Sequence, residues 1–328
     1  MEHELVDVVG VGNAIVDVIT HATDEFVNQQ GLAKGSMTLI DDDRARDLYA
    51  TMGPGIEASG GSAANTVAGV ASFGGSASYI GKIRDDLLGE VFAHDMRASG
   101  VEFSVLPAAD GPDTARCLIL VTDDAQRTMS TYLGISSLLE PSDINPETVR
   151  RGQILFCEGY LWDVDSAKAA IRHSMDIAAQ AGRKVAFTAS DSFCVERHHQ
   201  EFLDLVAGPI DILFANQAEL TSLYQCDFDA AVDEVRAKVD LGCLTMGSDG
   251  SLLVTADEVF QVKAELLAPV VDTTGAGDQY AAGVLFGLAR GMALADAGRL
   301  GSLAAAEVIS HVGPRPQQPL IELLELVD

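Results

Sequence analysis

Short apolar runs alternate along the chain with longer stretches in which apolar positions recur at helical spacing. Four runs have the length and content typical of strands buried in a parallel sheet: Val6–Val11, Ile154–Cys157, Lys184–Phe187 and Ile210–Phe214. Four stretches predict helices: Ser62–Phe73, Leu87–Ser99, Ser166–Gln180 and Phe202–Ala207. Because this alternation builds right-handed βαβ units, it predicts an α/β fold with a doubly wound, mostly parallel sheet flanked by helices.

Two regions depart from this rhythm and predict a second, smaller sheet. Residues 14–40 and about 113–134 contain segments of alternating polarity, such as Arg116–Val121 and Thr128–Leu133, with little helical pattern between them. We interpret both regions as parts of a small β-sheet that projects from the main domain and forms a lid over the substrate. An ordinary edge hairpin is the alternative interpretation.

The last third of the chain predicts a β-meander followed by two helices. Leu241–Val254 and Val259–Val271 predict the meander, with a strand that ends at Val271. Ala276–Arg290 and Leu294–His311 predict the helices. Since the sequence shows no internal repeat, we expect residues 1–328 to form a single domain with its lid.

Composition and charge narrow the classes of partner. The 328 residues carry a net charge of -28, which repels nucleic acid phosphates and anionic membranes and argues against both as partners. No apolar run is long enough to span a bilayer, and the acidic start MEHELVDVVG does not resemble a secretion signal. Five widely spaced cysteines without a CxxC pair predict reduced thiols in a cytoplasmic protein: Cys117, Cys157, Cys194, Cys226 and Cys243.

The segment from Val271 to Gly283 carries the strongest chemical signal. It reads V-D-T-T-G-A-G-D-Q-Y-A-A-G, which predicts the end of a strand, small residues and then a helix rich in Ala and Gly. Such a helix N-terminus directs backbone N–H groups and the positive end of its dipole toward a cavity, and small side chains allow close approach. We therefore predict an anion hole for phosphate, formed by Gly275, Ala276 and Gly277.

Asp278 directly follows this predicted anion hole. A carboxylate beside a phosphate site is repulsive unless it has a chemical task, and kinases use Asp to accept the proton of an attacking hydroxyl. We predict Asp278 as this catalytic base; electrostatic stabilisation of the helix terminus is the alternative. No G-x-x-x-x-G-K-[ST] loop occurs, and Ile15 and Tyr280 replace the third Gly of a dinucleotide fingerprint, which disfavours a dehydrogenase.

Two long motifs far apart in the chain carry a resemblance to a known family. Asp272–Gly283 resembles the C-terminal signature of PfkB-type, ribokinase-like kinases. The N-terminal signature of these kinases is similar to Gly60–Asn65, followed by Gly74-Gly75, Gly81 and Asp85–Gly89. Within this superfamily the chain is most similar to adenosine kinases, nearly end to end, including Gly12–Asp17, Thr188–Phe193, Asp211–Glu219 and Thr245–Gly250. The resemblance implies a ribokinase-like fold with a small β-sheet lid.

The resemblance also implies a site for the phosphoryl acceptor. Asp17 would hold two ribose hydroxyls, because one carboxylate can accept both hydrogen bonds of a vicinal diol. The predicted substrate-binding set is Asn13, Asp17, Gly60, Gly61, Ser62 and Asn65. Without the resemblance, these residues would be interpreted as a strand-end carboxylate, a turn and the polar first turn of a helix.

The ATP and metal sites follow from the same resemblance. Asn216, Thr245, Gly247 and Gly250 would approach ATP, and Glu219 would help to hold Mg²⁺ through water, as hard oxygen ligands do. Asn216 and Glu219 also have the spacing of a capping box at a helix start. Asp272 would lie near a monovalent cation such as K⁺.

The pocket for a nucleobase is less defined in the sequence. For any one apolar candidate taken alone, an ordinary core role is the favoured interpretation. The candidates are Ile15, Met37, Leu39, Leu133, Trp162 and Phe193. His311 and Arg315 would border the adenine of ATP or lie on the surface.

The predicted reaction is transfer of the ATP γ-phosphoryl group to the 5′-hydroxyl of a nucleoside, with adenosine converted to AMP and Mg²⁺ as cofactor. Residues Gly35–Asp41 leave the choice of base open. The alternatives are a PfkB-type sugar kinase, a kinase for inosine, guanosine or cytidine, and a non-enzymatic binding protein of the same fold. Whether the protein is a monomer or a homodimer also stays open.

Overall fold

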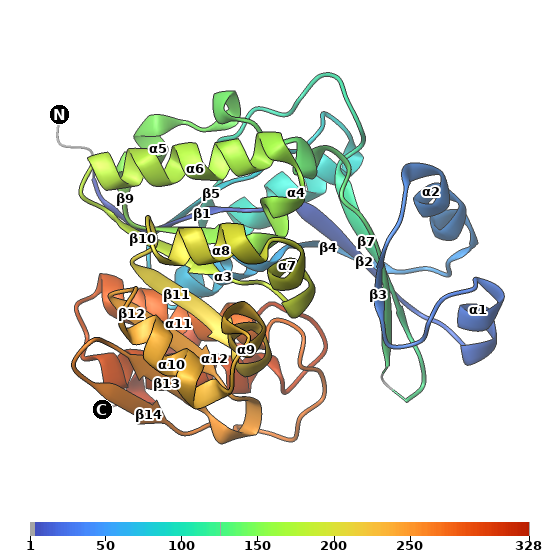
Figure 1. Cartoon of the computed structure of the whole chain (residues 1–328). Coiled ribbons are helices and arrows are strands. Elements are labelled where there is room, and N and C mark those ends of the chain that lie inside the picture. The colour runs from blue at the N-terminus through green and yellow to red at the C-terminus, as the bar shows by residue number, and fades with distance from the viewer. Residues whose placement is uncertain (1–3, 125, 328) are drawn as a thin grey trace.

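The structure is a computed structural model that describes residues 4–124 and 126–327. Nine strands form the main sheet in the order β14-β13-β12-β11-β10-β9-β1-β5-β6 (Figure 1). Neighbours pair in parallel from β6 to β12, and β13 and β14 are added in antiparallel pairs. The strands are β1 (Val6–Val11), β5 (Ala77–Ile80), β6 (Val101–Glu102), β9 (Gly152–Glu158), β10 (Lys184–Thr188), β11 (Ile212–Asn216), β12 (Leu241–Thr245), β13 (Ser251–Val254) and β14 (Val259–Val262).

The strand order reverses between β1 and β9. From β1 the chain proceeds to β5 and β6 on one side, and it then returns to β9 and continues outward on the other side. In doubly wound sheets, ligands bind in the crevice beyond the carboxyl ends of the two strands at such a reversal. The predicted α/β fold with a doubly wound, mostly parallel sheet is confirmed, and its topology directs attention to the residues after β1 and β9.

Helices cover both faces of the main sheet because successive residues of a buried strand face opposite ways. In β1, Val9 and Val11 pack with the helices on one face, whereas Val8 packs with those on the other. The first face holds α5 (Pro146–Arg151), α6 (Asp165–Gln180), α7 (Ser192–Arg197), α8 (His199–Val206), α9 (Gln217–Tyr224) and α10 (Phe228–Arg236). The second face holds α3 (Ser62–Ser72), α4 (Leu87–Ala98) and α11 (Ala276–Ala289), with α12 (Leu294–Val308) packed along α11.

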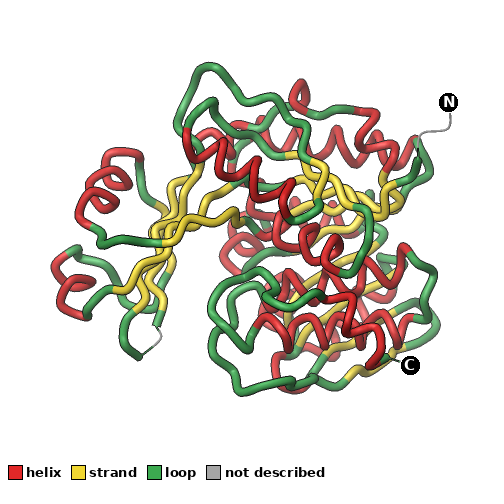
Figure 2. Tube along the Cα trace, turned by 180° about the vertical axis from the view of Figure 1, so that it is seen from behind, coloured by secondary structure: helices red, strands yellow, loops and turns green. Residues whose placement is uncertain are grey.

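A second sheet of five strands lies beside this body, in the order β3-β8-β7-β2-β4 (Figures 1 and 2). Its strands are β2 (Ile15–His21), β3 (Met37–Leu39), β4 (Ile56–Gly60), β7 (Ala115–Val121) and β8 (Arg127–Tyr132). The predicted small sheet is therefore present, but α1 (Asp24–Gln29) lies inside the region expected to lack helices, and α2 (Asp42–Thr51) and β4 were not predicted. A six-residue helix such as α1 is too short to leave a clear period.

The predicted end of the last strand of the meander, at Val271, is wrong. β14 stops at Val262, and Val271 lies in a loop with 47% of its surface exposed, where its N–H donates to the carbonyl of Ile309. The stretch up to Val271 is apolar, but apolar content alone does not provide strand pairing. Among the described residues, no helix is long and apolar enough to cross a membrane.

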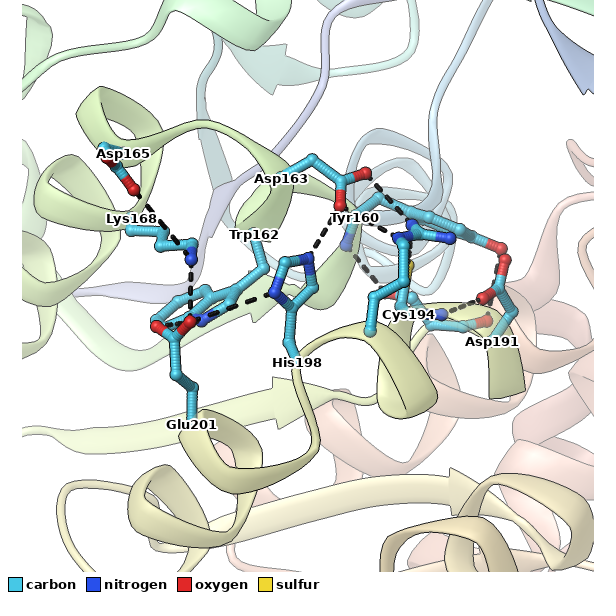
Figure 3. A network of polar contacts seen from close by, with 11 residues as sticks. Tyr160, Trp162, Asp163, Asp165, Lys168, Asp191, Cys194, His198 and Glu201 are labelled. Atoms are coloured by element: carbon cyan, nitrogen blue, oxygen red, sulfur yellow. Dashed lines mark hydrogen bonds and ion pairs between the residues drawn. The ribbon is translucent and has the colours of Figure 1, made fainter.

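Trp162 is a core residue rather than part of a base pocket. It is fully buried, and its ring packs edge-on against Phe187 and Phe202 at centroid distances of 6.1 and 5.9 Å. Its indole N–H donates to Glu201, and Figure 3 shows that the same carboxylate also accepts a hydrogen bond from the Lys168 ammonium group. The surrounding polar contacts connect the chain after β9 to α8, so the core interpretation of Trp162, which was favoured over a nucleobase contact, is confirmed.

We predict that Trp162→Ala destabilises the fold without altering the affinity for a small-molecule ligand. Truncation of a large buried aromatic side chain leaves a cavity and costs about 3–5 kcal/mol of unfolding free energy. Urea denaturation measures this loss, with the exposed Phe193→Ala as the matched aromatic control, because Phe193 is 71% exposed. Weaker ligand binding with an unchanged unfolding free energy would show instead that Trp162 belongs to the binding site.

Candidate active site

A buried carboxylate, Glu158, lies at the end of β9, where the strand order reverses. Glu158 Oε1 accepts hydrogen bonds from Asn13 N (2.7 Å) and Asn13 Nδ2 (2.8 Å), and Oε2 accepts from Ala63 N (2.8 Å). Burial raises the pKa of Glu158 to about 7, and these hydrogen bonds oppose the increase. Glu158 therefore joins the segment after β1 to the N-terminus of α3.

Two helix N-termini converge on Asp278, which lies in the first turn of α11. Ser62 Oγ donates to Asp278 Oδ1 (2.7 Å), and Asn65 Nδ2 donates to Asp278 Oδ2 (2.9 Å), both from the first turn of α3. Gly61 begins α3 at φ 99°, a conformation that favours glycine. The structure thus brings the predicted residues Ser62, Asn65 and Asp278 into direct contact.

The environment of Asp278 makes it a weak acid that is still ionised at neutral pH. Burial raises its pKa to about 6, while the hydrogen bonds from Ser62 and Asn65 and the charge of Arg315 act in the opposite direction. A carboxylate with a pKa near but below the working pH is well suited to accept a proton during a reaction. This geometry and pKa allow the base role predicted for Asp278.

Asp17 lies across the site on β2 and depends on the absence of a side chain at Gly60. A Cβ added at Gly60 would lie 2.5 Å from Asp17 Oδ2, so Gly60 permits the close approach of β4. Burial raises the pKa of Asp17 to about 7, the charges of Arg315 and Arg127 lower it, and Asp278 raises it further. Asp17 and Asp278 therefore belong to one electrostatic cluster.

Arg315 contributes a cation to this cluster from the loop after α12. Its Nε donates to Asn65 Oδ1 (2.7 Å), and its Nη2 donates to Ser59 Oγ (3.1 Å). Burial lowers the pKa of Arg315 to about 10, whereas the neighbouring Asp17 and Asp278 raise it. The surface alternative for Arg315 is therefore wrong, because its half-buried side chain lies beside these carboxylates. Its expected place beside the adenine of ATP stays a prediction. His311 instead lies against Glu307, with Nε2 3.2 Å from Oε1.

The predicted anion hole is only partly available in this conformation. Gly275 begins α11 at φ 78°, and a Cβ there would lie 2.7 Å from Pro314 Cα. The Ala276 N–H donates to the carbonyl of Thr273 (3.2 Å), so it is not free for an anion. Within the described chain, the N–H groups of Gly275 and Gly277 have no acceptor, and these two remain open to a ligand.

Asp272 is paired with an arginine of the small sheet. Arg127 Nη2 lies 2.8 Å from Asp272 Oδ2, both side chains are at most 9% exposed, and Arg127 Nη1 donates to Thr274 Oγ1 (2.7 Å). Asp272 also accepts from Thr274 N and from Gly313 N, each at 3.0 Å. Because a guanidinium and two N–H groups already surround this carboxylate, it does not fit the K⁺ site expected there.

Asn216 and Glu219 form a capping box at the start of α9, as their spacing predicted. Glu219 N donates to Asn216 Oδ1 and Asn216 N donates to Glu219 Oε2, each at 2.9 Å. Burial raises the pKa of Glu219 to about 7. No group of three or more His, Cys, Asp or Glu side chains in the described part of the chain could hold a metal ion. The amide and carboxylate oxygens fit only an ion that keeps most of its waters, as Mg²⁺ does.

The predicted ATP-binding turn lies next to this capping box. Thr245 at the end of β12 pairs in register with Asn216 at the end of β11. The following turn contains Gly247 at φ 59° and Gly250 at φ 93°, and a Cβ at Gly250 would lie 2.0 Å from the carbonyl oxygen of Val262. Backbone conformation therefore favours glycine at position 247, and the lack of space requires it at position 250, whether or not ATP binds there.

The apolar candidates for a base pocket are not gathered at one place. Met37, Leu39 and Phe193 are 45%, 51% and 71% exposed. A cavity does lie along β3, the end of β8 and the 3-10 turn Gly134–Leu138, lined by Leu39, Ile40, Pro112, Thr131, Tyr132, Leu133, Gly134, Ser137 and Leu138. Two of the candidates, Leu39 and Leu133, share this cavity. None of the clustered carboxylates lines it, but Ser136 Oγ of the same turn lies 2.8 Å from Asn13 Oδ1, and Asn13 donates to Glu158, so the cavity neighbours the carboxylate cluster.

Sequence reasoning missed Glu158 and Arg127 and did not place Arg315 beside the carboxylates. Glu158 could have been found, because an acidic residue at the carboxyl end of a central parallel strand lies in the ligand-binding crevice. Arg127 and Arg315 lie in ordinary polar surroundings in the sequence, and only tertiary packing brings them to the carboxylates.

Similarity to known proteins agrees with this class of fold, a doubly wound α/β protein with a second small sheet. A probable sugar kinase from Rhizobium etli CFN 42 is 46% identical, with TM-score 0.92 over 99% of both chains. Adenosine kinase from Sinorhizobium meliloti is 48% identical, with TM-score 0.92 over 98% of this chain and 99% of that chain. A curated relative, 5-dehydro-2-deoxygluconokinase of Geobacillus kaustophilus, is 26% identical over 278 residues, 81% of this chain and 83% of its own.

A family model described as pfkB family carbohydrate kinase matches residues 55–320. The chain belongs to this family. The resemblance to ribokinase-like kinases that the two sequence motifs carried is thereby confirmed, and the similar solved structures include both adenosine kinase and a probable sugar kinase.

We predict that Gly60→Ala weakens the acceptor site selectively. The added Cβ would collide with the Asp17 carboxylate, so the KM for the phosphoryl acceptor should rise about tenfold or more, equivalent to about 1.4 kcal/mol. The KM for ATP should not change. Gly53→Ala is the matched control, because a Cβ there meets only Thr20 Oγ1 at 3.5 Å. If both variants had the same KM for the phosphoryl acceptor, the prediction that Asp17 binds the acceptor would be contradicted.

Proposed function

We propose that this kinase transfers the γ-phosphoryl group of ATP to the 5′-hydroxyl of a nucleoside, with adenosine as the preferred acceptor. The observation that carries the proposal is the position of Asp278, whose carboxylate lies at the N-terminus of α11 beside the open N–H groups of Gly275 and Gly277. The likeness to adenosine kinase from Sinorhizobium meliloti, at 48% identity over 98% of this chain, supports the choice of acceptor.

Asp278 acts as the general base in the proposed mechanism. With a pKa of about 6 it is ionised at neutral pH, and it accepts the proton of the 5′-hydroxyl as that oxygen attacks the γ-phosphorus. Ser62 and Asn65 hold the two carboxylate oxygens in place. The N–H groups of Gly275 and Gly277, with the dipole of α11 behind them, stabilise the charge that develops on the transferred group.

The ATP phosphates lie, in this proposal, between the anion hole and the turn after β12. Thr245, Gly247 and Gly250 would approach ATP, and Asn216 and Glu219 would hold Mg²⁺ through water. When bound, Mg²⁺ neutralises part of the phosphate charge. With a pKa of about 7, Glu219 is only partly ionised at neutral pH when no cation is bound. A nearby cation would favour its ionised form.

Asp17 binds the acceptor, and the small sheet closes over it. A carboxylate on β2 with Gly60 beside it leaves room for two hydroxyl groups of a ribose to donate to Asp17. Closure of the small sheet would exclude water, which otherwise competes with the acceptor for the phosphoryl group. Arg127 already connects β8 to the loop before α11, so the small sheet and the anion hole are mechanically linked.

A sugar kinase is the second candidate. The curated relative from Geobacillus kaustophilus and the probable sugar kinase from Rhizobium etli both point to a free sugar or sugar acid as the acceptor. The acid–base groups and the anion hole would serve either acceptor in the same way.

We predict that adenosine has the highest kcat/KM in a parallel assay of ATP consumption. The panel consists of adenosine, inosine, guanosine, cytidine, ribose, fructose and 5-dehydro-2-deoxygluconate, with Mg²⁺ present. Phosphorus NMR of the product should show a 5′-monophosphate. A free sugar or sugar acid in first place would support the second candidate and would require a smaller acceptor at Asp17.

We predict that Asp278→Asn lowers kcat by at least about 100-fold, the lower end of the contribution of a general base. In the unsubstituted enzyme, kcat/KM should fall as the pH drops below about 6, because protonation of Asp278 removes the base. Asp229→Asn, at an exposed position in the first turn of α10, is a control that keeps Asp278. A variant at Asp278 that folds and retains nearly full kcat would contradict the assignment.

A further inference from the structure

The loop after α12 is fixed at several points around Arg315. Gly313 N donates to Asp272 Oδ2 (3.0 Å), and Gln279 Nε2 donates to the Pro314 carbonyl (3.0 Å). On the other side, the N–H groups of Gln317 and Gln318 each donate to Glu307 Oε1 at 3.0 Å. The backbone on both sides of Arg315 is therefore held to α11 and α12, and the arginine is directed into the site from a rigid support.

Arg315 determines which way the Asn65 amide points. An arginine has only donors, so the Asn65 atom that faces Arg315 Nε at 2.7 Å must be the oxygen. The amide nitrogen then faces the other way and donates to Asp278 Oδ2 at 2.9 Å. With the amide reversed, its oxygen would face the Asp278 carboxylate and its nitrogen would face the guanidinium, and both contacts would be repulsive.

We propose that Arg315 is a positioning residue for phosphoryl transfer, which acts through Asn65 to hold the Asp278 carboxylate in its reactive orientation. This inference rests on the proposed role of Asp278 as the base. Arg315 donates to Asn65, Asn65 donates to Asp278 Oδ2, and Ser62 fixes Asp278 Oδ1 from the same turn of α3. The relay leaves Asp278 with one defined rotamer at the end of α11.

The charge of Arg315 has a second effect, because the site contains several acids. Besides Ser62 and Asn65, five titratable groups shift the pKa of Asp278 or are shifted by it: Asp17 on β2, Tyr79 on β5, Glu158 at the end of β9, Tyr160 beyond it, and Arg315. Arg127 adds a more distant positive charge that lowers the pKa of Asp17. Arg315 lowers the pKa of both Asp17 and Asp278, so its loss removes a positive charge that acts on both acids.

A lysine at position 315 separates the two effects. Lysine keeps a positive charge, but its single ammonium cannot reproduce the planar pair of donors that reach Asn65 Oδ1 and Ser59 Oγ. Methionine has a similar length and removes both the charge and the donors. Comparing Arg315→Lys with Arg315→Met therefore distinguishes orientation of the amide from stabilisation of the carboxylate charge.

We expect Arg315→Met to lower kcat about tenfold or more and to leave the KM for ATP unchanged. The acid limb of the kcat/KM profile should move up by about one pH unit, the lower end of the effect of a neighbouring arginine on a carboxylate. Arg315→Lys should lower kcat less and keep the acid limb near that of the unsubstituted enzyme. Arg299→Met is the control, because Arg299 lies on α12 and pairs with Glu265, which is not one of these carboxylates.

Wild-type kcat and an unmoved acid limb in a folded Arg315→Met variant would overturn the inference. If that variant does not fold, Arg315→Lys decides, and wild-type kcat there would overturn the role of the amide. Carbon-13 NMR titration of the Asp278 carboxyl needs no substrate and so separates this inference from the proposed reaction. A higher Asp278 pKa in Arg315→Met supports the electrostatic effect even if no acceptor is phosphorylated, whereas an unchanged pKa contradicts it.

Discussion

The burial of three carboxyl groups in one crevice is the constraint around which the rest of the molecule is arranged. Asp17, Glu158 and Asp278 each have a raised pKa, between about 6 and 7, because the surrounding protein withholds water from them. Buried charge is costly unless donors and opposite charge surround it. The N-terminus of α3 supplies N–H, hydroxyl and amide donors, and Arg315 supplies the opposite charge.

The fold meets this constraint by bringing distant segments to one edge of the main sheet. The reversal of strand order between β1 and β9 opens a crevice, and α3 and α11 pack side by side with their N-termini toward the acids. The small sheet adds Asp17 and Arg127, and the loop after α12 adds Arg315. Two opposing effects set the pKa of Asp278. Desolvation raises this pKa and makes Asp278 a better base, but without the hydrogen-bond donors the same desolvation would leave the carboxyl group protonated.

Much of this arrangement could be predicted from the sequence, because long periodic segments and glycine-rich motifs carry strong local signals. The doubly wound sheet and the second small sheet agree with the expected elements. The two motifs also identified Ser62, Asn65 and Asp278 as site candidates, and the structure brings these three into contact, which the sequence did not predict. Arg127, Glu158 and Arg315 could not be assigned in this way, since a single charged residue has no period and its partners lie far away in the chain. The same limit explains why the apolar stretch to Val271 suggested a strand that has no pairing partner, and why Trp162 was considered for a pocket although it packs in the core.

The most direct test of the account is a crystal structure with adenosine and a non-hydrolysable ATP analogue bound. The account predicts that the 5′-oxygen lies within hydrogen-bonding reach of the Asp278 carboxylate, about 3 Å, and that the 2′- and 3′-hydroxyls donate to Asp17. It also predicts that Arg315 keeps its hydrogen bond to Asn65. A nucleoside seated in the cavity along β3 and β8, with its 5′-oxygen far from Asp278, would contradict the central claim that this carboxylate is the base.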